Sequence, residues 1–528
     1  MPIRLTVFFV VVCVLLAQGY FLPAKGPVSY PLYGLQTLLT TVYKVSINPQ
    51  LITASCYLLS FEKYTQIFGF LFLFRYIRLL ISIFGYWIYK PIPIPSNPTL
   101  TSNDTTVIVP TVDPFNLDFA ECIFSIAATK PASIIIVTAG GYQNFKQAST
   151  YSNLLPQSNI LVLSSPIVSK RRQISLGLSH TVTAITILCD DHVFWPSTFM
   201  PHLLAPFHNR TIGAVCTNKC VRRTSQAGTL TWASYWNLIG VLYLERCSFD
   251  TCATNTVDGG VFVLSGRTVG YRTTILQDPA CIASFLGEYV GMGRLKVGPL
   301  NVDDDNFYTR WIISHGWKIQ VQAPAGGEAK VETTLGEWPK YLRQCLRWSR
   351  TTWRSNPKAL FIDRTVIGTY PWSTYAIYIA HLFNFALFYD LALLCTLHLS
   401  LSSSGHSKAW LCALSLWILA SKLVKVAPYF AAHPKDLMLL PGYILFGWFH
   451  SLIKLYALFS LWDISWAGRQ GLGDGDDIGA GNGPCLVGKE TSGKVTRVGD
   501  SPSDKNQNND ETSGDWANFN SHGNQGLN

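Results

Sequence analysis

Hydrophobic positions form long runs at the two ends of the chain and short runs in its middle. The first long run, 5–22, contains no charged residue, and as a helix it would extend about 27 Å, close to the hydrocarbon thickness of a bilayer. We predict an uncleaved span rather than a signal peptide, because no small-residue cleavage site follows it. A second span is predicted at about 66–89, where Arg75 and Arg78 must face a protein interior or reach the lipid head groups.

The N-terminal membrane region is predicted to cover residues 1–95. Between the two spans, residues 30–61 are moderately apolar and could lie along the membrane interface. The sequence PIPIP at 91–95 ends the helical pattern, because proline lacks the amide donor that a helix needs.

Short apolar runs between residues 100 and 335 have the length and composition of buried strands. Helix-compatible segments separate several of them, a pattern typical of a doubly wound, mostly parallel sheet. Ligands of such sheets bind at the carboxyl ends of the strands, so candidate chemistry is expected there. The predicted strands are 105–110, 132–139, 159–165 and 183–189.

Long apolar runs return after the middle region and predict a C-terminal membrane region at 369–465. Its predicted spans are 371–399, 409–430 and 437–462. The tail at 470–528 is rich in Gly, Asn, Asp and Ser and is predicted to be disordered. The predicted fold is therefore an α/β, Rossmann-like domain inserted between N- and C-terminal transmembrane helices.

Composition agrees with a membrane protein. Only 14% of the 528 residues are charged, against about 25% in an ordinary soluble chain, and 48% are hydrophobic. The net charge is +10, yet the basic residues are scattered, without the basic tract and interleaved aromatics that would indicate nucleic-acid binding. The 13 cysteines show no metal-site spacing, and we expect reduced thiols rather than disulfides.

Two acidic groups directly follow predicted strands. Thr111 and Asp113 follow the first, where a carboxylate could accept a hydrogen bond from a base or ribose, or could cap a helix. Asp190, Asp191 and His192 follow the strand 183–189. Adjacent carboxylates suit a hard divalent cation that neutralises a diphosphate, although a loop of solvated acids would have the same sequence.

A third acidic group, Asp303-Asp304-Asp305, opens a predicted helix. Burying three neighbouring acids requires a cation or a raised pKa, and a carboxylate that titrates near neutrality could take a proton from a hydroxyl. The simpler interpretation is favourable acidic charge at a helix N-terminus.

A fourth group lies in a predicted interfacial helix at 336–358. Gln344, Arg347 and Trp348 share one face of that helix, with Arg able to pair with phosphate and Trp able to support a sugar or base. The alternative is an amphipathic helix whose arginines reach lipid head groups.

In this order the four groups resemble processive glycosyltransferases of family 2, over about residues 100–465. DDNFYTR at 304–310 resembles the acidic motif of hyaluronan synthases, and QCLRWSR at 344–350 fits the QxxRW pattern of the family. DDHVFWP at 190–196 and the WAGR sequence at 466–469 are similar to fungal type 2 glycosyltransferases, which are also called capsular polysaccharide synthase-like proteins. The resemblance implies a GT-A catalytic domain.

The resemblance also implies roles for single residues. Asp305, with Asp304 beside it, would be the general base, and Thr111, Asp113 and Asp190 would contact the nucleotide. Gln344, Arg347 and Trp348 would hold the diphosphate and the acceptor end, and the acceptor would also meet Ser265, Gly266 and Arg267. The metal, Mg²⁺ or Mn²⁺, would bind among Asp190, Asp191 and His192.

The metal motif departs from the Asp-x-Asp pattern of the family. Alignment on the following His-Val puts Cys189 first and Asp191 second, whereas alignment on the first acid puts Asp190 first and His192 second. The sequence leaves both registers open.

The implied function is inverting, processive transfer from a UDP-sugar to a growing polysaccharide that is exported through the membrane. A cytosolic catalytic domain, the plasma membrane, fungal cell-wall or extracellular polysaccharide and hyphal growth are the implied context. A non-processive enzyme that glycosylates a lipid such as ceramide is the nearest alternative, and a non-catalytic transporter or scaffold is the alternative from another class. Which UDP-sugar is used stays open.

A cytosolic catalytic domain predicts that the Asn-x-Thr sequons at Asn103 and Asn209 carry no glycan. Treatment of the protein from its native host with an N-glycosidase should leave its gel mobility unchanged. A shift that maps to either asparagine would contradict this topology.

Overall fold

The computed structural model describes residues 49–291, 296–301, 303–401 and 406–464. The predicted span at 5–22, the predicted disordered tail at 470–528 and the sequence at 466–469 lie outside the described residues.

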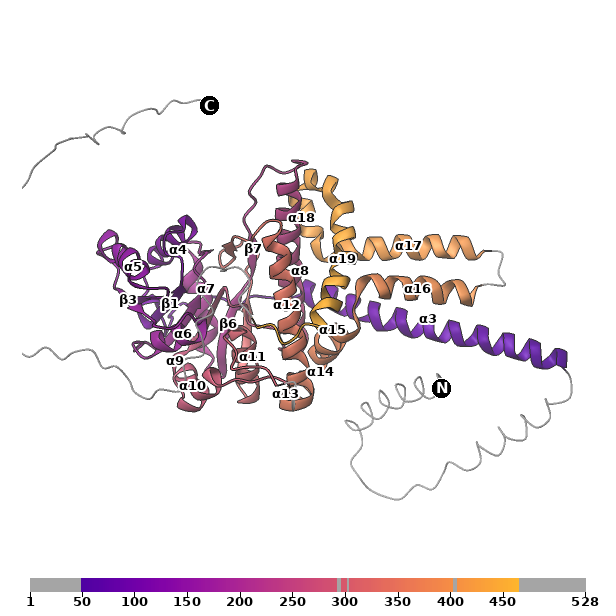
Figure 1. Ribbon diagram of the computed structural model, residues 1–528, viewed down its shortest axis with the longest axis horizontal. Coiled ribbons are helices and arrows are strands. Elements are labelled where there is room, and N and C mark those ends of the chain that lie inside the picture. Colours follow the sequence, from indigo (N-terminus) through magenta and orange to yellow (C-terminus); the bar gives the residue numbers. More distant parts are fainter. Residues whose placement is uncertain (1–48, 292–295, 302, 402–405, 465–528) are drawn as a thin grey trace, which may run out of the picture. The chain divides into compact units, whose positions relative to one another are not determined.

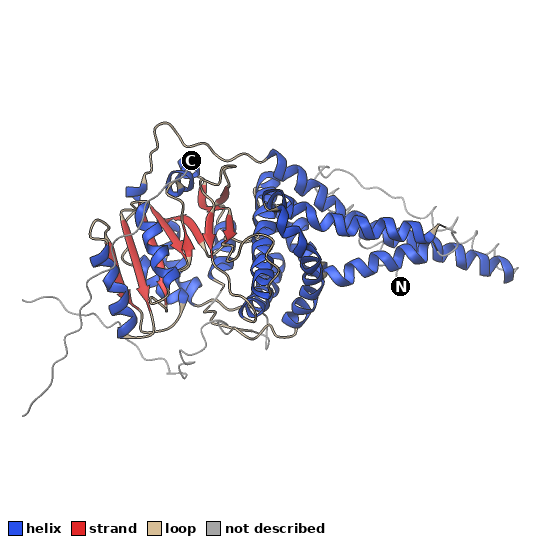
Figure 2. Cartoon of the chain, turned by 90° about the horizontal axis from the view of Figure 1, so that it is seen from above, coloured by secondary structure: helices blue, strands red, loops and turns tan. Residues whose placement is uncertain are grey.

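A seven-stranded sheet forms the centre of the α/β region, in the order β3-β2-β1-β4-β8-β6-β9 (Figures 1 and 2). All neighbouring strands are parallel except β8, which is antiparallel to both β4 and β6. The four predicted strands are confirmed as β1 to β4, and the mostly parallel sheet is confirmed with them. The strands are β1 (Thr105–Thr111), β2 (Ser133–Thr138), β3 (Ile160–Ser164), β4 (Ile185–Cys189), β6 (Ile212–Thr217), β8 (Thr268–Arg272) and β9 (Lys318–Gln322).

Both faces of this sheet are buried. Val107 belongs to one hydrophobic cluster and its neighbour Ile108 to another, because successive side chains of a strand point to opposite faces. Coverage on both faces explains why the strands are continuous apolar runs. The helices of this region are α4 (Leu117–Ala128), α5 (Tyr142–Leu154), α6 (Lys170–Leu178), α7 (Phe199–Leu204), α8 (Trp232–Asp258), α9 (Thr273–Leu276), α10 (Pro279–Leu286) and α11 (Asp304–Ser314), with short 3₁₀ turns at Ser102–Asp104 and Ala205–His208.

A small second sheet connects the α/β region to the helix predicted at 336–358. Its order is β5-β10-β7, with β5 at Val193–Phe194, β7 at Lys219–Val221 and β10 at Val331–Thr333. The helix itself is α12 (Lys340–Pro357), which packs against the long apolar helix α19 (Leu440–Leu458). The residues of the QxxRW pattern therefore lie where the α/β region meets the apolar helices.

Apolar helices make up the rest of the described chain. Helix α3 (Pro49–Ile88) packs against α8 and against α16 (Ala386–Ser400), and α16 packs against α17 (Ser407–Leu423), so α3, α16 and α17 lie side by side (Figures 1 and 2). The remaining elements are π-helical segments at Lys358–Asp363 and Thr374–Ile379, 3₁₀ turns at Val424–Val426 and Pro434–Leu439, and α13 (Thr365–Thr369), α14 (Pro371–Ser373), α15 (Ala380–Phe383) and α18 (Ala427–Ala432).

Three helical stretches of the described chain are long and apolar enough to cross a membrane: Lys63–Ile88, Ser407–Ala432 and Pro434–Leu458. The run predicted as a span at 371–399 is two helices, Pro371–Phe383 and Ala386–Ser400, bent by 86° at their break, as in a broken span or a re-entrant loop. Counting the bent pair as one span gives up to four. Residues 49–61, part of the stretch 30–61 that could lie along the interface, form the first part of the continuous helix α3.

Charged side chains within the apolar helices are bonded to other side chains or to backbone carbonyls. Arg75 forms an ion pair with Asp390, which also accepts from Lys422 and Trp448 at 2.7 Å each. Arg78 donates to the carbonyl oxygen of Ala376 at 3.2 Å. The expectation that these two arginines face a protein interior is confirmed, since a charge exposed to lipid would be costly.

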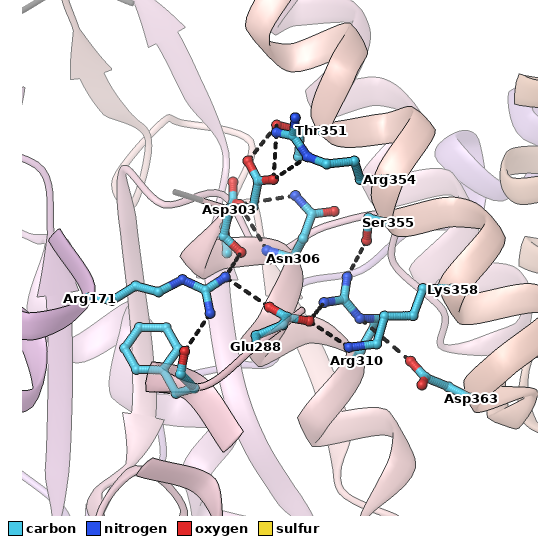
Figure 3. A network of polar contacts seen from close by, with 12 residues as sticks. Arg171, Glu288, Asp303, Asn306, Arg310, Thr351, Arg354, Ser355, Lys358 and Asp363 are labelled. Atoms are coloured by element: carbon cyan, nitrogen blue, oxygen red, sulfur yellow. Dashed lines mark hydrogen bonds and ion pairs between the residues drawn. The ribbon is translucent and has the colours of Figure 1, made fainter. Parts of the chain in front are cut away.

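A buried ion network lies behind the acidic group at 303–305 (Figure 3). Glu288 is its centre and pairs with Arg171 of α6 at 2.8 Å, with Lys358 at 2.7 Å and with Arg310 of α11. Burial alone would raise the pKa of Glu288, but the three cations outweigh burial and lower it to about 2. One carboxylate thus joins α6, α11 and the end of α12.

Replacing Glu288 with Gln should lower the free energy of unfolding by about 3–5 kcal/mol, because three buried cations lose their counter-charge. Because the folded pKa is depressed, the contribution is present above the ordinary Glu pKa and is lost as pH falls toward 2. Thermal unfolding of the protein in nanodiscs measures the change. The matched Glu245→Gln variant, which removes a more exposed pair with Lys330, should cost at most about 1 kcal/mol. Equal losses in both variants would contradict the central role of Glu288.

Candidate active site

The four groups identified in the sequence meet at one cavity of about 720 Å³. It lies at the carboxyl ends of β1 and β4, where the antiparallel strand β8 begins, and it continues between α8, α12 and the apolar helices. Of the predicted site residues only Thr111 does not line it. The others are Asp113, Asp190, Asp191, His192, Ser265, Gly266, Arg267, Asp304, Asp305, Gln344, Arg347 and Trp348.

The loop after β4 presents its two aspartates differently. Asp191 is buried, accepting a 2.8 Å hydrogen bond from the Thr111 hydroxyl and lying 3.0 Å from the His192 ring. Asp190 lies more openly at the cavity, and its backbone amide donates to the Arg267 carbonyl at 2.9 Å. Thr111 therefore orients Asp191 from behind, whereas the carboxylate of Asp190 faces the cavity and pairs there with Lys170.

Lys170 was missed in the sequence. It is the first residue of α6, and its Nζ lies 2.8 Å from Asp190 and 2.9 Å from Asp304. Burial opposes its charged form, but the two carboxylates outweigh burial and raise its pKa. A basic residue opening the helix after the third predicted strand, at the same sheet edge as the acids, was the signal that could have identified it.

Asp303 holds the acidic group in place. Its φ of 65° is in the left-handed region, which Asp adopts at a modest cost, and its carboxylate pairs with Arg354 of α12 at 2.8 Å. Thr351 donates to the same carboxylate, and Arg171 donates to its carbonyl oxygen at 3.3 Å. Figure 3 shows Arg354 and Thr351 converging on Asp303.

Asp305 lines the cavity, and its pKa is raised toward neutrality. Burial, followed by the adjacent charge of Asp304, raises its pKa to about 6. Its carboxylate accepts only from Asn306, at 2.8 Å from the amide and 3.0 Å from the side chain, among the hydrogen bonds found in the described chain. The carboxylate can therefore accept a proton near neutral pH.

Gly266 brings the backbone before β8 close to the acids. A Cβ at this position would lie 3.3 Å from Lys170 Nζ and 3.6 Å from Asp304 Oδ2. The neighbouring Arg267 donates to Ser265 at 3.3 Å, while its buried Nε has no partner in the described part of the chain. The segment 265–267 thus places the Arg267 guanidinium at the same cavity as the acids, with its Nε–H available to a ligand.

Helix α12 supplies the opposite wall. Trp348 stacks on Tyr243 of α8, with ring centroids 5.1 Å apart, and the Arg267 guanidinium lies 5.7 Å from the Trp348 ring. The buried Nε of Arg347 has no partner in the described residues, and Gln344 accepts from the amide of Gly336 at 3.3 Å. Two guanidinium groups with unused donors, at one cavity, suit a phosphate-bearing ligand.

Comparison with known proteins assigns the chain to a family. A family model described as "Glycosyltransferase like family 2" matches residues 103–351. A type 2 glycosyltransferase of Pyricularia oryzae is 38% identical over 420 residues, 79% of this chain and 84% of that protein. The chain belongs to glycosyltransferase family 2. A type 2 glycosyltransferase of Gibberella zeae is 37% identical to this glycosyltransferase over 430 residues, 80% of each chain.

The fold of this glycosyltransferase is GT-A, with its mostly parallel sheet. A solved mannosyltransferase of Pyrobaculum calidifontis, in complex with GDP-Man and Mn²⁺, aligns with a TM-score of 0.46 and 14% identity, covering 75% of this chain and 99% of that one.

The side chains of the cavity supply part of a coordination shell for a divalent cation, and substrate phosphates would supply the rest. No three His, Cys, Asp or Glu side chains within the described residues form a metal site by themselves. Asp190 and Asp304 nevertheless share one cation position, which the Lys170 ammonium holds. Mg²⁺ is commonly held by one or two carboxylates plus substrate phosphates, and this donor set is of that kind.

Replacing Asp305 with Asn should lower turnover about 10²–10⁴-fold, because the amide cannot accept the proton. In the wild type, kcat/KM should fall as pH drops below about 6, where Asp305 becomes protonated. Rates from pH 5 to 8 in nanodiscs measure this.

The Asp304→Asn variant is the control for this assignment. Removing the neighbouring charge should lower the pKa of Asp305 and move the acid limb to lower pH. If the fall of kcat/KM at acid pH occurs at the same pH in both variants, a group other than Asp305 causes it.

Proposed function

We propose that this glycosyltransferase is an inverting, processive enzyme that transfers a sugar from a UDP-sugar to a growing polysaccharide and passes the product into the membrane. The observation that carries the proposal is a single cavity that contains the base Asp305, the cationic side chains Lys170, Arg267 and Arg347, and polar residues of the apolar helices. Donor, acceptor and exit can thus share one continuous space.

The donor would lie at the sheet end of the cavity. Asp113 is exposed just after β1, with its amide held by the Thr111 hydroxyl at 3.2 Å, and could accept from a ribose or base. Arg347 and Arg267 would meet the diphosphate with their unused donors, and Gln344 would adjoin it. Asp190 would hold the cation, with Asp191 fixed beside it by Thr111, and bound Mg²⁺ or Mn²⁺ would neutralise the charge of the departing diphosphate.

The acceptor hydroxyl would approach Asp305 past Ser265 and Gly266. Asp305 would remove the hydroxyl proton while Lys170 and Arg347 stabilise the negative charge that develops on the leaving diphosphate. One displacement at the anomeric carbon needs a base on the acceptor side and cations on the donor side. Asp305 and the Lys170–Arg347 pair supply these two halves.

Trp348 would support the acceptor sugar. Its ring is already fixed by Tyr243 on one side and lies at the cavity wall, so a sugar can pack on it without ordering a mobile side chain. A platform in the same cavity as the base would hold the chain end between successive transfers, which is what processive extension requires.

Export is supported by the part of the cavity that reaches the apolar helices. His381, Asn384 and Lys454 line it there, at the break between α15 and α16. Their polar atoms would give a polysaccharide partners where lipid would give none. We place the chain in the plasma membrane with a cytosolic catalytic domain, serving fungal cell-wall or extracellular polysaccharide synthesis during hyphal growth.

Purified protein in nanodiscs, supplied with Mg²⁺ or Mn²⁺ and a panel of labelled nucleotide-sugars, should form long polymer from a UDP-sugar. Product size on a gel measures processivity, and the Asp305→Asn variant is the control. A single sugar on extracted lipid would contradict processivity, polymer from a GDP-sugar would contradict the UDP assignment, and no turnover with any donor would contradict both.

A further inference from the structure

Charges are segregated along the cavity. Seven of the eight aspartates that line it belong to the loops, α4 and α11 at the sheet end, and only Asp250 of α8 lies toward the apolar helices. We call this second part the helical end, defined by Arg78, Arg246, Asp250, Lys425 and Lys454. Among these described lining residues, four are cations and one is a carboxylate.

The one carboxylate of the helical end is already engaged. Asp250 accepts from Lys425 at 2.6 and 2.8 Å. Arg78 donates to the Ala376 carbonyl, and Lys454 donates to the carbonyls of His381 and Asn384. In the described part of the chain, none of Arg78, Arg246 and Lys454 forms an ion pair with a carboxylate.

Part of this charge has a structural explanation. Lys454 donates to carbonyl groups at the break between α15 and α16, so its ammonium has a structural role there. Arg246 contacts only aromatic side chains among the partners found for it in the described chain: its guanidinium lies 5.6 Å from the Tyr243 ring, hydrogen-bonds to Tyr443 and lines the cavity. A guanidinium retained between apolar helices without a carboxylate indicates an anionic ligand.

We propose that the helical end binds the acidic sugars of a uronic-acid-containing glycan, so that the polysaccharide made at this site carries carboxylates. The proposal rests on the proposed function, because it takes the helical end as the path of the growing chain. Asp305 lines the same cavity and suits a hydroxyl as the reacting acceptor group, whereas a phosphate oxygen is already ionised and needs no base. A glycan with a hydroxyl at its reacting end matches Asp305, and carboxylates farther along that glycan match the cations of the helical end.

The test measures binding without any donor. A labelled oligogalacturonate and the same oligosaccharide with its carboxyls reduced to alcohols are titrated into full-length protein in nanodiscs. The wild type should bind the acidic form about tenfold more tightly than the neutral form, and the ratio should shrink at high salt. Arg246→Gln and Arg78→Gln should each lower that ratio about fivefold without changing the affinity for the neutral form.

Two controls separate charge from folding. Arg246→Lys should keep most of the ratio, and Lys408→Gln, which removes an exposed cation from α17 away from the cavity, should keep all of it. A wild-type ratio near one, or a ratio unaffected by both arginine variants, would overturn the proposal. Stronger competition by vesicles containing polyprenyl phosphate than by the acidic oligosaccharide would also overturn it, assigning the site to a lipid phosphate.

Binding and turnover fail independently. Polymer synthesis without a preference for the acidic oligosaccharide would remove the inference and leave the proposed function. Charge-dependent binding of the acidic oligosaccharide, without polymer from any donor, would remove the proposed function and leave an acidic-glycan site.

Discussion

The ion pair between Asp303 and Arg354 connects the two halves of the active site. Asp303 precedes α11 and therefore sets where Asp304 and Asp305 face, while Arg354 belongs to α12, which carries Gln344, Arg347 and Trp348. Both side chains are buried, and Arg171 reaches the same backbone from α6. The cationic side chains and the carboxylate proposed as the base thus share one fixed frame, and catalysis by positioning needs such rigidity.

Glu288 extends this frame. It gathers Arg171, Arg310 and Lys358 around one carboxylate, and these residues come from α6, α11 and the segment after α12. Lys170, which bridges Asp190 and Asp304, is the neighbour of Arg171 in α6. Lys170, at the cavity, and Arg171, in the buried network, therefore lie in the same turn of α6.

Much of this arrangement could be predicted from local sequence. The strands were recognisable because burial on both faces demands continuous apolar runs, and the acids could be placed because parallel strands end at one edge. Lys170 and Glu288 were not found, because each pairs with partners on separate elements, including one that is more than 100 residues away in sequence. The bend after Phe383 was also missed, since hydropathy reports length and not direction. The part of the site built by long-range ion pairs was therefore invisible to pattern analysis.

The contacts at the end of α19 have a consequence for the chain that follows it. Arg350 pairs with Asp463 and donates to the Ser460 hydroxyl at 3.0 Å, and Arg354 donates to the Leu461 carbonyl at 3.0 Å. The last described residues are thus fastened to the same helix that carries the QxxRW pattern. A displacement of Leu461 or Asp463 would therefore act on Arg354, and through Arg354 on Asp303, without passing through the cavity. The end of the described chain is therefore linked, through two arginines of one helix, to the aspartate that precedes the acidic pair.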